Sequence, residues 1–106
     1  GESDGSPLHW ACSSGAVAVV RILLNAGASV RSVDIQGWTP LHAAIIASAA
    51  DCAEALLAAR ADANARDAYG MTPLAWAVKN GALPCVGLLL CWGANAGIAD
   101  AQGLLP

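Results

Sequence analysis

Charged side chains are scarce in this sequence of 106 residues. Asp, Glu, Lys and Arg make up 12% of it, against about 25% in a typical globular domain. The five basic residues are scattered along the chain, and the formal net charge is -3. A nucleic-acid-binding surface needs a basic patch or stripe. We therefore expect no nucleic-acid partner.

The sequence also lacks a recognisable membrane or targeting segment. Residues 80–99 carry no charge and would be long enough to cross a bilayer, but Pro84, Asn95 and several glycines interrupt them. These interruptions argue against a membrane span. The first ten residues, GESDGSPLHW, have neither the basic start nor the apolar core of a signal peptide. We expect no membrane partner.

Cysteine and histidine spacings typical of metal sites or disulfide frameworks are missing. The cysteines at 12, 52, 85 and 91 form no C-x-x-C pair and have no zinc-type spacing with the two histidines. Reduced thiols of an intracellular protein, cytoplasmic or nuclear, account for them most simply. His9 precedes Cys12 by three residues, but Cys12 shares its repeat position with Ile45 and Val78, which favours an apolar core. We find no active site, and we expect no metal, cofactor or small-molecule substrate.

An internal repeat organises the chain. SPLHWA at 6–11, TPLHAA at 39–44 and TPLAWA at 72–77 place three prolines 33 residues apart. The same spacing recurs at other positions: Asp34, Asp67 and Asp100, then Gly37, Gly70 and Gly103, and the Leu-Leu pairs 23/24, 56/57 and 89/90. Such regularity predicts a repeat architecture.

Each unit predicts a helix, a turn, a second helix and a projecting loop. Ser or Thr before the proline is a good N-cap, and proline fits the first helical position because its missing N–H would have no partner there. Leu8, Ala11 and Cys12 fall on one face of the first helix at helical spacing. The segment 28–37 and its counterparts, rich in Asp and Gly, indicate a hairpin-like connection.

The motif T-P-L-H-x-A in a 33-residue unit resembles the ankyrin repeat. The resemblance implies an all-α solenoid of stacked helix-turn-helix units, one domain over residues 1–106 with repeats at about 1–33, 34–66 and 67–99 and a partial repeat at 100–106. It further implies a non-catalytic module that binds a protein partner through a concave groove and loop tips. The alternative is a regulatory or structural segment of a larger enzyme, channel or scaffold protein that contacts its own neighbouring domains.

Three residues depart from the repeat pattern. Ala75 replaces the histidine found at His9 and His42, so the third unit loses the polar tie that an imidazole makes. Ser48 and Arg60 stand where the other units have glycine. A residue with a side chain held in the left-handed conformation costs about 1 kcal/mol, so we expect the middle unit to be looser or differently bent.

The resemblance implies that partner contacts use the positions where the units differ. Trp38 and Met71, with Gly5 and Leu104 in the same position, should be exposed in the loop before the cap; for Trp38 the alternative is packing on the neighbouring loop. Trp10 and Trp76 share a helix position in which structural and recognition roles are equally expected. The remaining candidates line the loops or end the first helices on the groove side: Ile35, Gln36, Tyr69, Ser13, Ser14, Ile46, Lys79 and Asn80.

Two further sites follow from the same comparison. Asn64 occupies the loop position that an asparaginyl hydroxylase modifies in ankyrin proteins, although a turn asparagine is the simpler interpretation. Cys91 and Trp92 end an apolar helix where other units have polar residues, and a solenoid end needs a polar cap. We expect them to be covered by further repeats, by self-association or a partner, or by residues 97–106 folding back.

Overall fold

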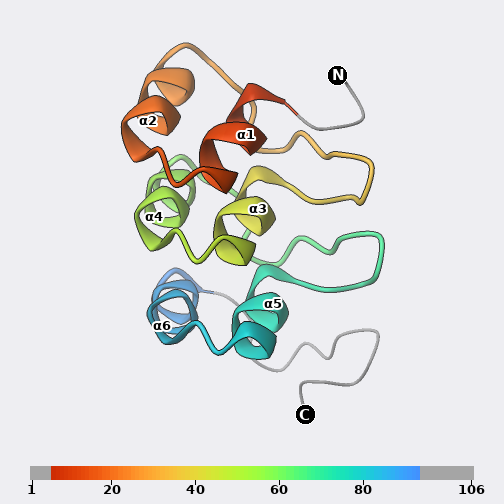
Figure 1. The fold of residues 1–106 in the computed structure, drawn as a ribbon. Coiled ribbons are helices and arrows are strands. Elements are labelled where there is room, and N and C mark those ends of the chain that lie inside the picture. Colours follow the sequence, from red (N-terminus) through yellow and green to blue (C-terminus); the bar gives the residue numbers. More distant parts are fainter. Residues whose placement is uncertain (1–5, 94–106) are drawn as a thin grey trace.

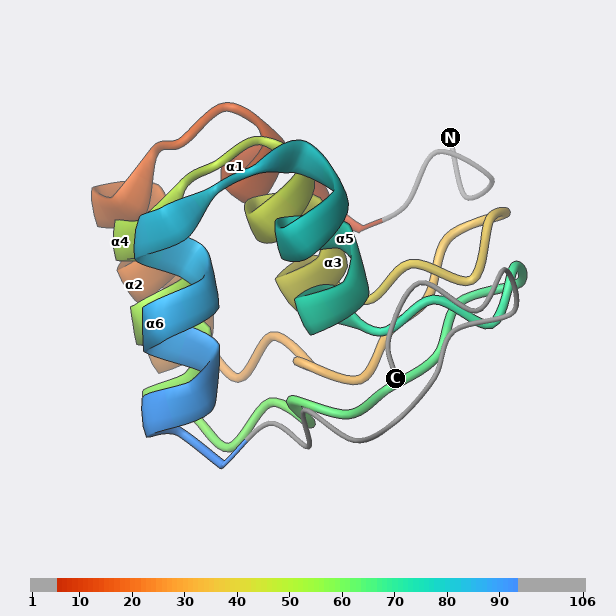
Figure 2. The same ribbon diagram turned by 90° about the horizontal axis from the view of Figure 1, so that it is seen from below.

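The computed structural model describes residues 6–93, and this part of the chain folds into six helices without a strand. Helices α1, α3 and α5 stack in one row and α2, α4 and α6 in a second (Figures 1 and 2). The predicted all-α repeat architecture is confirmed. The bounds are α1 Pro7–Ser13, α2 Val17–Asn25, α3 Pro40–Ile46, α4 Ala50–Ala58, α5 Pro73–Asn80 and α6 Leu83–Cys91.

The first helix of each unit begins as the sequence predicts. The hydroxyls of Ser6, Thr39 and Thr72 each accept a hydrogen bond from the backbone N–H three residues later. A proline follows each cap, with its φ already set for a helix. The loops that follow α2 and α4 project to one side of the stack (Figure 1).

A histidine on each of α1 and α3 joins that helix to the loop that follows the second helix of its unit. Nδ1 of His42 accepts the backbone N–H of Thr39 at 3.2 Å. Its Nε2 therefore carries the proton and donates to the carbonyl of Met71, 2.9 Å away. His9 repeats both contacts, with Ser6 and with the carbonyl of Trp38. The third unit has Ala75 in this position, whose backbone N–H donates to the Thr72 hydroxyl and whose side chain has no hydrogen-bonding atom.

The cysteines at 12, 52 and 85 are buried in the core, as the repeat position of Cys12 predicted. Burial, and to a smaller extent the nearby Cys52, raises the pKa of the Cys12 thiol to about 12. The thiolate is the nucleophilic form of cysteine. Cys12 is therefore a structural side chain beside the leucines of the core.

The middle unit keeps the geometry of its neighbours despite its missing glycines. Ser48 and Arg60 hold positive φ values of 56° and 72°. They pass through the left-handed region, as Gly15 and Gly27 do in the first unit. Helices α3 and α4 have the same 7 and 9 residues as α1 and α2. The middle unit thus keeps its helix lengths and bears backbone strain of about 1 kcal/mol at each of the two positions.

The buried His42 ring predicts a pH dependence of stability. Burial lowers the pKa of His42 below its ordinary 6.5, although the bond to the Met71 carbonyl partly opposes the shift. Below about pH 6.5 the unfolded chain therefore binds a proton that the folded chain does not bind. The free energy of unfolding then decreases as the pH is lowered. Urea denaturation followed by tryptophan fluorescence should show this fall between pH 6.5 and 5. The variant His42→Asn should lose most of it, and a flat profile in the wild-type chain would contradict the assignment.

Candidate protein-interaction surface

The loops that follow α2 and α4 each contain the same kind of turn, built around an aspartate. Oδ1 of Asp34 accepts the backbone N–H groups of Gln36 and Trp38 at 2.9 and 3.0 Å. Asp67 makes the same pair of bonds to Tyr69 and Met71, both at 2.9 Å. The backbone N–H of each aspartate also donates to the carbonyl four residues on. The hairpin-like connection predicted for these segments is therefore a carboxylate-centred turn.

Neighbouring loops touch through their backbones. The N–H of Ala68 donates to the carbonyl of Gln36 at 2.9 Å. Gly37 has a φ of +76°, and a Cβ at this position would come within 2.7 Å of the Ala68 nitrogen. Only glycine allows both this conformation and this close approach. The two loops therefore form one continuous surface.

Met71 is not the exposed contact residue that the sequence predicted. Its side chain is 1% exposed. The turn at Asp67 holds its N–H, and His42 donates to its carbonyl. Both backbone groups of Met71 are thus used within the fold, and its side chain is buried. We correct the prediction, since a buried thioether cannot contact a partner.

Trp38 is half-buried rather than exposed, and it packs on the neighbouring loop. Its indole N–H donates to Oδ2 of Asp67 at 2.8 Å. The indole of Trp76 donates to the same oxygen at the same distance. The two rings meet edge to face with centroids 6.0 Å apart. The alternative interpretation of Trp38, packing on the next loop, thus describes its position better, and we call these three side chains the Asp67 cluster.

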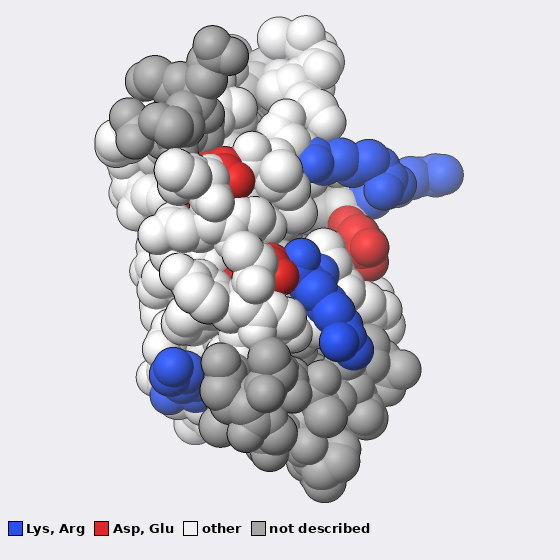
Figure 3. All heavy atoms as spheres, turned by 90° about the vertical axis from the view of Figure 1, so that its right-hand side faces the viewer, with Lys and Arg blue, Asp and Glu red and all other residues white. Residues whose placement is uncertain are grey.

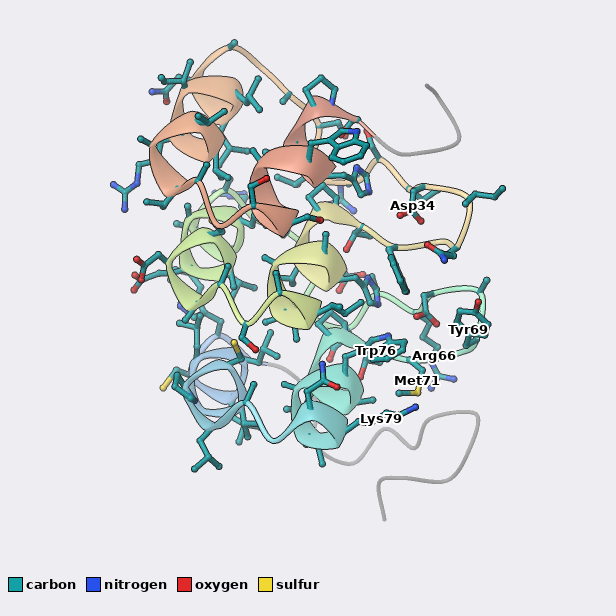
Figure 4. The ribbon with its side chains drawn as sticks, in the orientation of Figure 1. Asp34, Arg66, Tyr69, Met71, Trp76 and Lys79 are labelled. Carbon is teal, nitrogen blue, oxygen red and sulfur yellow. The ribbon has the colours of Figure 1, made fainter. Side chains whose placement is uncertain are left out.

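Asp67 holds this cluster together as an ion. Burial alone would raise the pKa of Asp67, but hydrogen bonds outweigh it and hold the pKa below 3.8. The donors are the Trp76 indole, the backbone N–H groups of Met71 and Tyr69, and the Trp38 indole. Lys79 extends from the same helix as Trp76 (Figure 4), with Nζ 5.2 Å from the centre of the Trp76 ring.

A hollow of about 500 Å³ lies between α1, α3 and the first described loop, and we call it the Asp34 pocket. Trp10 and Ile35 flank it and are 58% and 75% exposed. Figure 3 looks onto the loop tips and shows that most of the described surface there is uncharged. The residues that line the pocket are His9, Trp10, Ser13, Asp34, Ile35, Gln36, Trp38, Ala43, Ile46 and Ala47.

The pocket joins six of the sequence candidates, namely Trp10, Ser13, Ile35, Gln36, Trp38 and Ile46. Other candidates are exposed without lining it: Ser14, Tyr69, Lys79 and Asn80. Asn64 is half-buried, and its N–H donates to Oδ1 of Asp62. Its hydroxylation remains a prediction.

The end of α6 carries the two residues that the sequence predicts to be covered at the end of the solenoid. Cys91 is exposed, and Trp92 is 46% exposed. The residues predicted to follow as a partial repeat, with Leu104, lie outside the described residues, as does Gly5. What covers this end remains a prediction.

Sequence reasoning missed the roles of Asp34 and Asp67. Their 33-residue spacing was visible, but it was assigned only to the repeat pattern. The usable signal was the recurrence of an acidic side chain before a glycine three residues later, which is typical of a carboxylate-centred turn. A second hollow, of about 680 Å³, lies against the other side of Trp10 and was also missed.

Removing one oxygen from the Asp67 cluster should destabilise the fold. Asp67→Asn keeps Oδ1 for the loop and leaves two indole donors facing an NH₂ group, so the free energy of unfolding should fall by about 1–3 kcal/mol. Asp34→Asn is the matched control, because it keeps the equivalent loop bonds and has no indole partner among residues 6–93. Urea denaturation compares the two, and equal losses would contradict the role of the indoles.

A replacement of Trp38 tests the same cluster from its other side. Trp38→Ala removes the hydrogen bond to Asp67 and the edge contact with Trp76. We expect the melting temperature to fall, with a loss of about 2–4 kcal/mol. Calorimetry measures both. An unchanged melting temperature would show that Trp38 is free for a partner, as the sequence first suggested.

None of the helices within residues 6–93 is long and apolar enough to span a bilayer. The sequence matches the ankyrin repeats, in three copies, over residues 8–100. It is also 53% identical over 38 residues to the palmitoyltransferase AKR1 of Kluyveromyces lactis, a stretch that covers 36% of this chain and 5% of that protein. Ankyrin repeats generally mediate protein–protein interaction and are by themselves non-catalytic. With its 33-residue units, helix pairs and projecting loops, this chain belongs to the ankyrin repeat family.

Proposed function

We propose that this chain is a protein-interaction module whose partner lies across the loop tips and the row of first helices, centred on the Asp34 pocket. The observation that carries the proposal is the pairing of Trp10 with Ile35. These two large apolar side chains are more than half exposed on either side of a hollow. Aromatic anchors beside a pocket are typical hot spots of protein interfaces.

The loop backbone beneath this surface is held in place by contacts within the chain itself. The carbonyl of Trp38 accepts from Nε2 of His9, and its N–H is held by Asp34. A loop fixed at both backbone groups loses little conformational entropy on binding. The hollow is therefore a preformed site, and its exposed walls are available for contact.

Other exposed apolar side chains support the proposed surface less well. Ile22 on α2 and Leu83 on α6 are 65% and 78% exposed. They lie in the row of second helices, and they line neither of the two hollows described above. Apolar atoms make up more than half of the exposed surface of folded proteins, so exposed apolar side chains outside a hollow are common. These two provide matched controls rather than a second binding site.

A second candidate follows from the likeness to the palmitoyltransferase. The matched stretch is a small part of that protein, so a similar array can lie within a much longer chain. The same surface would then contact neighbouring domains of its own protein, as a regulatory or structural segment. Neither candidate needs a cofactor. The buried thiols at 12, 52 and 85 fit an intracellular protein, cytoplasmic or nuclear.

Capture of a partner from cell extract tests the proposal. The chain is immobilised as wild type, as Trp10→Ala, as Ile35→Ser and as the control Ile22→Ser, and bound proteins are identified by mass spectrometry. We expect a protein that the wild type and Ile22→Ser retain and that both pocket variants lose. Each pocket variant should weaken binding by about 1–3 kcal/mol and leave the melting temperature nearly unchanged.

Equal retention by all four forms would contradict the proposed surface. The second candidate makes a different prediction for a longer chain that contains this array. There Trp10→Ala should loosen the contact between the array and its own neighbouring domains, seen as faster backbone hydrogen exchange at loop 26–39, without any added partner.

A further inference from the structure

The two loop aspartates are equivalent in the repeat but differ at one oxygen. Oδ1 of each closes its own turn through two backbone N–H groups. Oδ2 of Asp67 accepts two indole N–H groups as well. No hydrogen bond from any residue in 6–93 reaches Oδ2 of Asp34. The second carboxylate oxygen of Asp34 therefore retains its full capacity to accept hydrogen bonds from outside the described chain.

The sequence explains this difference by simple spacing. The two donors to Asp67 stand 29 residues before it, at Trp38, and 9 residues after it, at Trp76. The same offsets from Asp34 lead to Gly5 and Ala43. Neither residue has a side chain that can donate a hydrogen bond. The loop that follows α2 thus has an aspartate equivalent to Asp67 but has no tryptophan at the positions equivalent to Trp38 and Trp76.

The missing side chain leaves a hollow where Trp76 lies in the next unit. The Asp34 pocket is lined by both Asp34 and Ala43, and its volume is about 500 Å³. Its other walls include Trp10, Ile35 and Ile46, which present apolar surface. An indole can lie within such a volume, since ligand pockets of about 300–1,000 Å³ hold whole small molecules.

We propose that the Asp34 pocket receives a tryptophan side chain of the protein partner, whose indole N–H donates to Oδ2 of Asp34. The proposal rests on the proposed function, because it names the partner group that this surface takes. The chain contains its own example of the contact. Trp76 makes it to Asp67 at 2.8 Å, from the helix position that Ala43 occupies in α3.

The chemistry of the pocket favours indole over other side chains. An indole has one N–H donor on a large apolar ring, so it satisfies a carboxylate oxygen and covers the apolar walls at once. A phenylalanine would fill the pocket but would bury the Asp34 carboxylate without a hydrogen-bond donor, and an unpaired buried acceptor costs binding free energy. A lysine would pair with the carboxylate but has a strongly hydrated head and a thin stem. Arginine is the nearest competitor and is included in the test.

A titration with a small probe tests the contact directly. The chain, labelled with ¹⁵N, is titrated with N-acetyltryptophanamide and with N-acetyl-1-methyltryptophanamide, which lacks the indole N–H. We expect chemical-shift changes at Trp10, Trp38 and Ala43. The first probe should bind about tenfold more tightly than the methylated one, because a hydrogen bond to a charged acceptor is lost.

Two aspartate variants show which carboxylate the probe uses. Asp34→Asn keeps the loop bonds at Oδ1, removes the second acceptor and should weaken binding of N-acetyltryptophanamide about tenfold. Asp51→Asn, in an exposed position on α4 outside the pocket, should leave binding unchanged. Equal affinities for the two probes, or tighter binding of N-acetylargininamide, would overturn the proposal.

The chain can also be given its own indole at this site. Ala43→Trp places a tryptophan in the position that Trp10 and Trp76 hold on α1 and α5. We expect a higher melting temperature and no binding of N-acetyltryptophanamide. Adding Asp34→Asn to this variant should remove the gain. A gain that survives the second change would show that the indole does not bond Asp34, and would overturn the proposal.

The same variants separate this proposal from the proposed function. A partner that is captured by the wild type and by Ala43→Trp alike would leave the interaction module standing and overturn the tryptophan site. Probe binding that depends on Asp34, with no protein captured through Trp10 and Ile35, would support the site and contradict the module.

Discussion

The hydrogen bond from a buried histidine to a loop carbonyl 29 residues later is the contact on which the surface depends. His9 makes it to Trp38 and His42 makes it to Met71. Each imidazole also accepts the backbone N–H of its own helix cap, so one neutral ring joins a helix start to the following loop. The aspartate turn then fixes the N–H of the same loop residue. With both backbone groups used, each loop is held to the helix row, and neighbouring loops lie close enough to form one surface.

Much of this arrangement follows from the sequence. The 33-residue spacing predicts the helix pairs, the Ser or Thr before proline predicts the caps, and missing glycines at Ser48 and Arg60 correctly mark strained positions. Exposure in the loops was harder to predict, because it depends on the neighbouring unit rather than on the residue's own unit. Trp38 donates its indole N–H to Asp67 of the next unit, and Met71 is buried although its loop position predicts exposure.

Equivalent positions in a repeat can serve stability in one unit and binding in another. Around Asp67 the chain supplies two indoles, and the carboxylate becomes part of the frame. Around Asp34 the corresponding residues are small, and a hollow with exposed apolar walls remains. In the third unit, Ala75 replaces the histidine, whereas the Thr72 hydroxyl still accepts the hydrogen bond that caps α5. Differences between units, rather than the shared motif, therefore point to the recognition site.

Backbone hydrogen exchange at Trp38 and Met71 tests the central claim that the loops are held in place by the fold. Their N–H groups donate to Asp34 and Asp67. If the loops are part of the frame, these two amides should exchange only through opening events nearly as costly as global unfolding. Exchange as fast as that of a freely exposed loop amide would show that the loops move independently, and the surface would then be no preformed binding site.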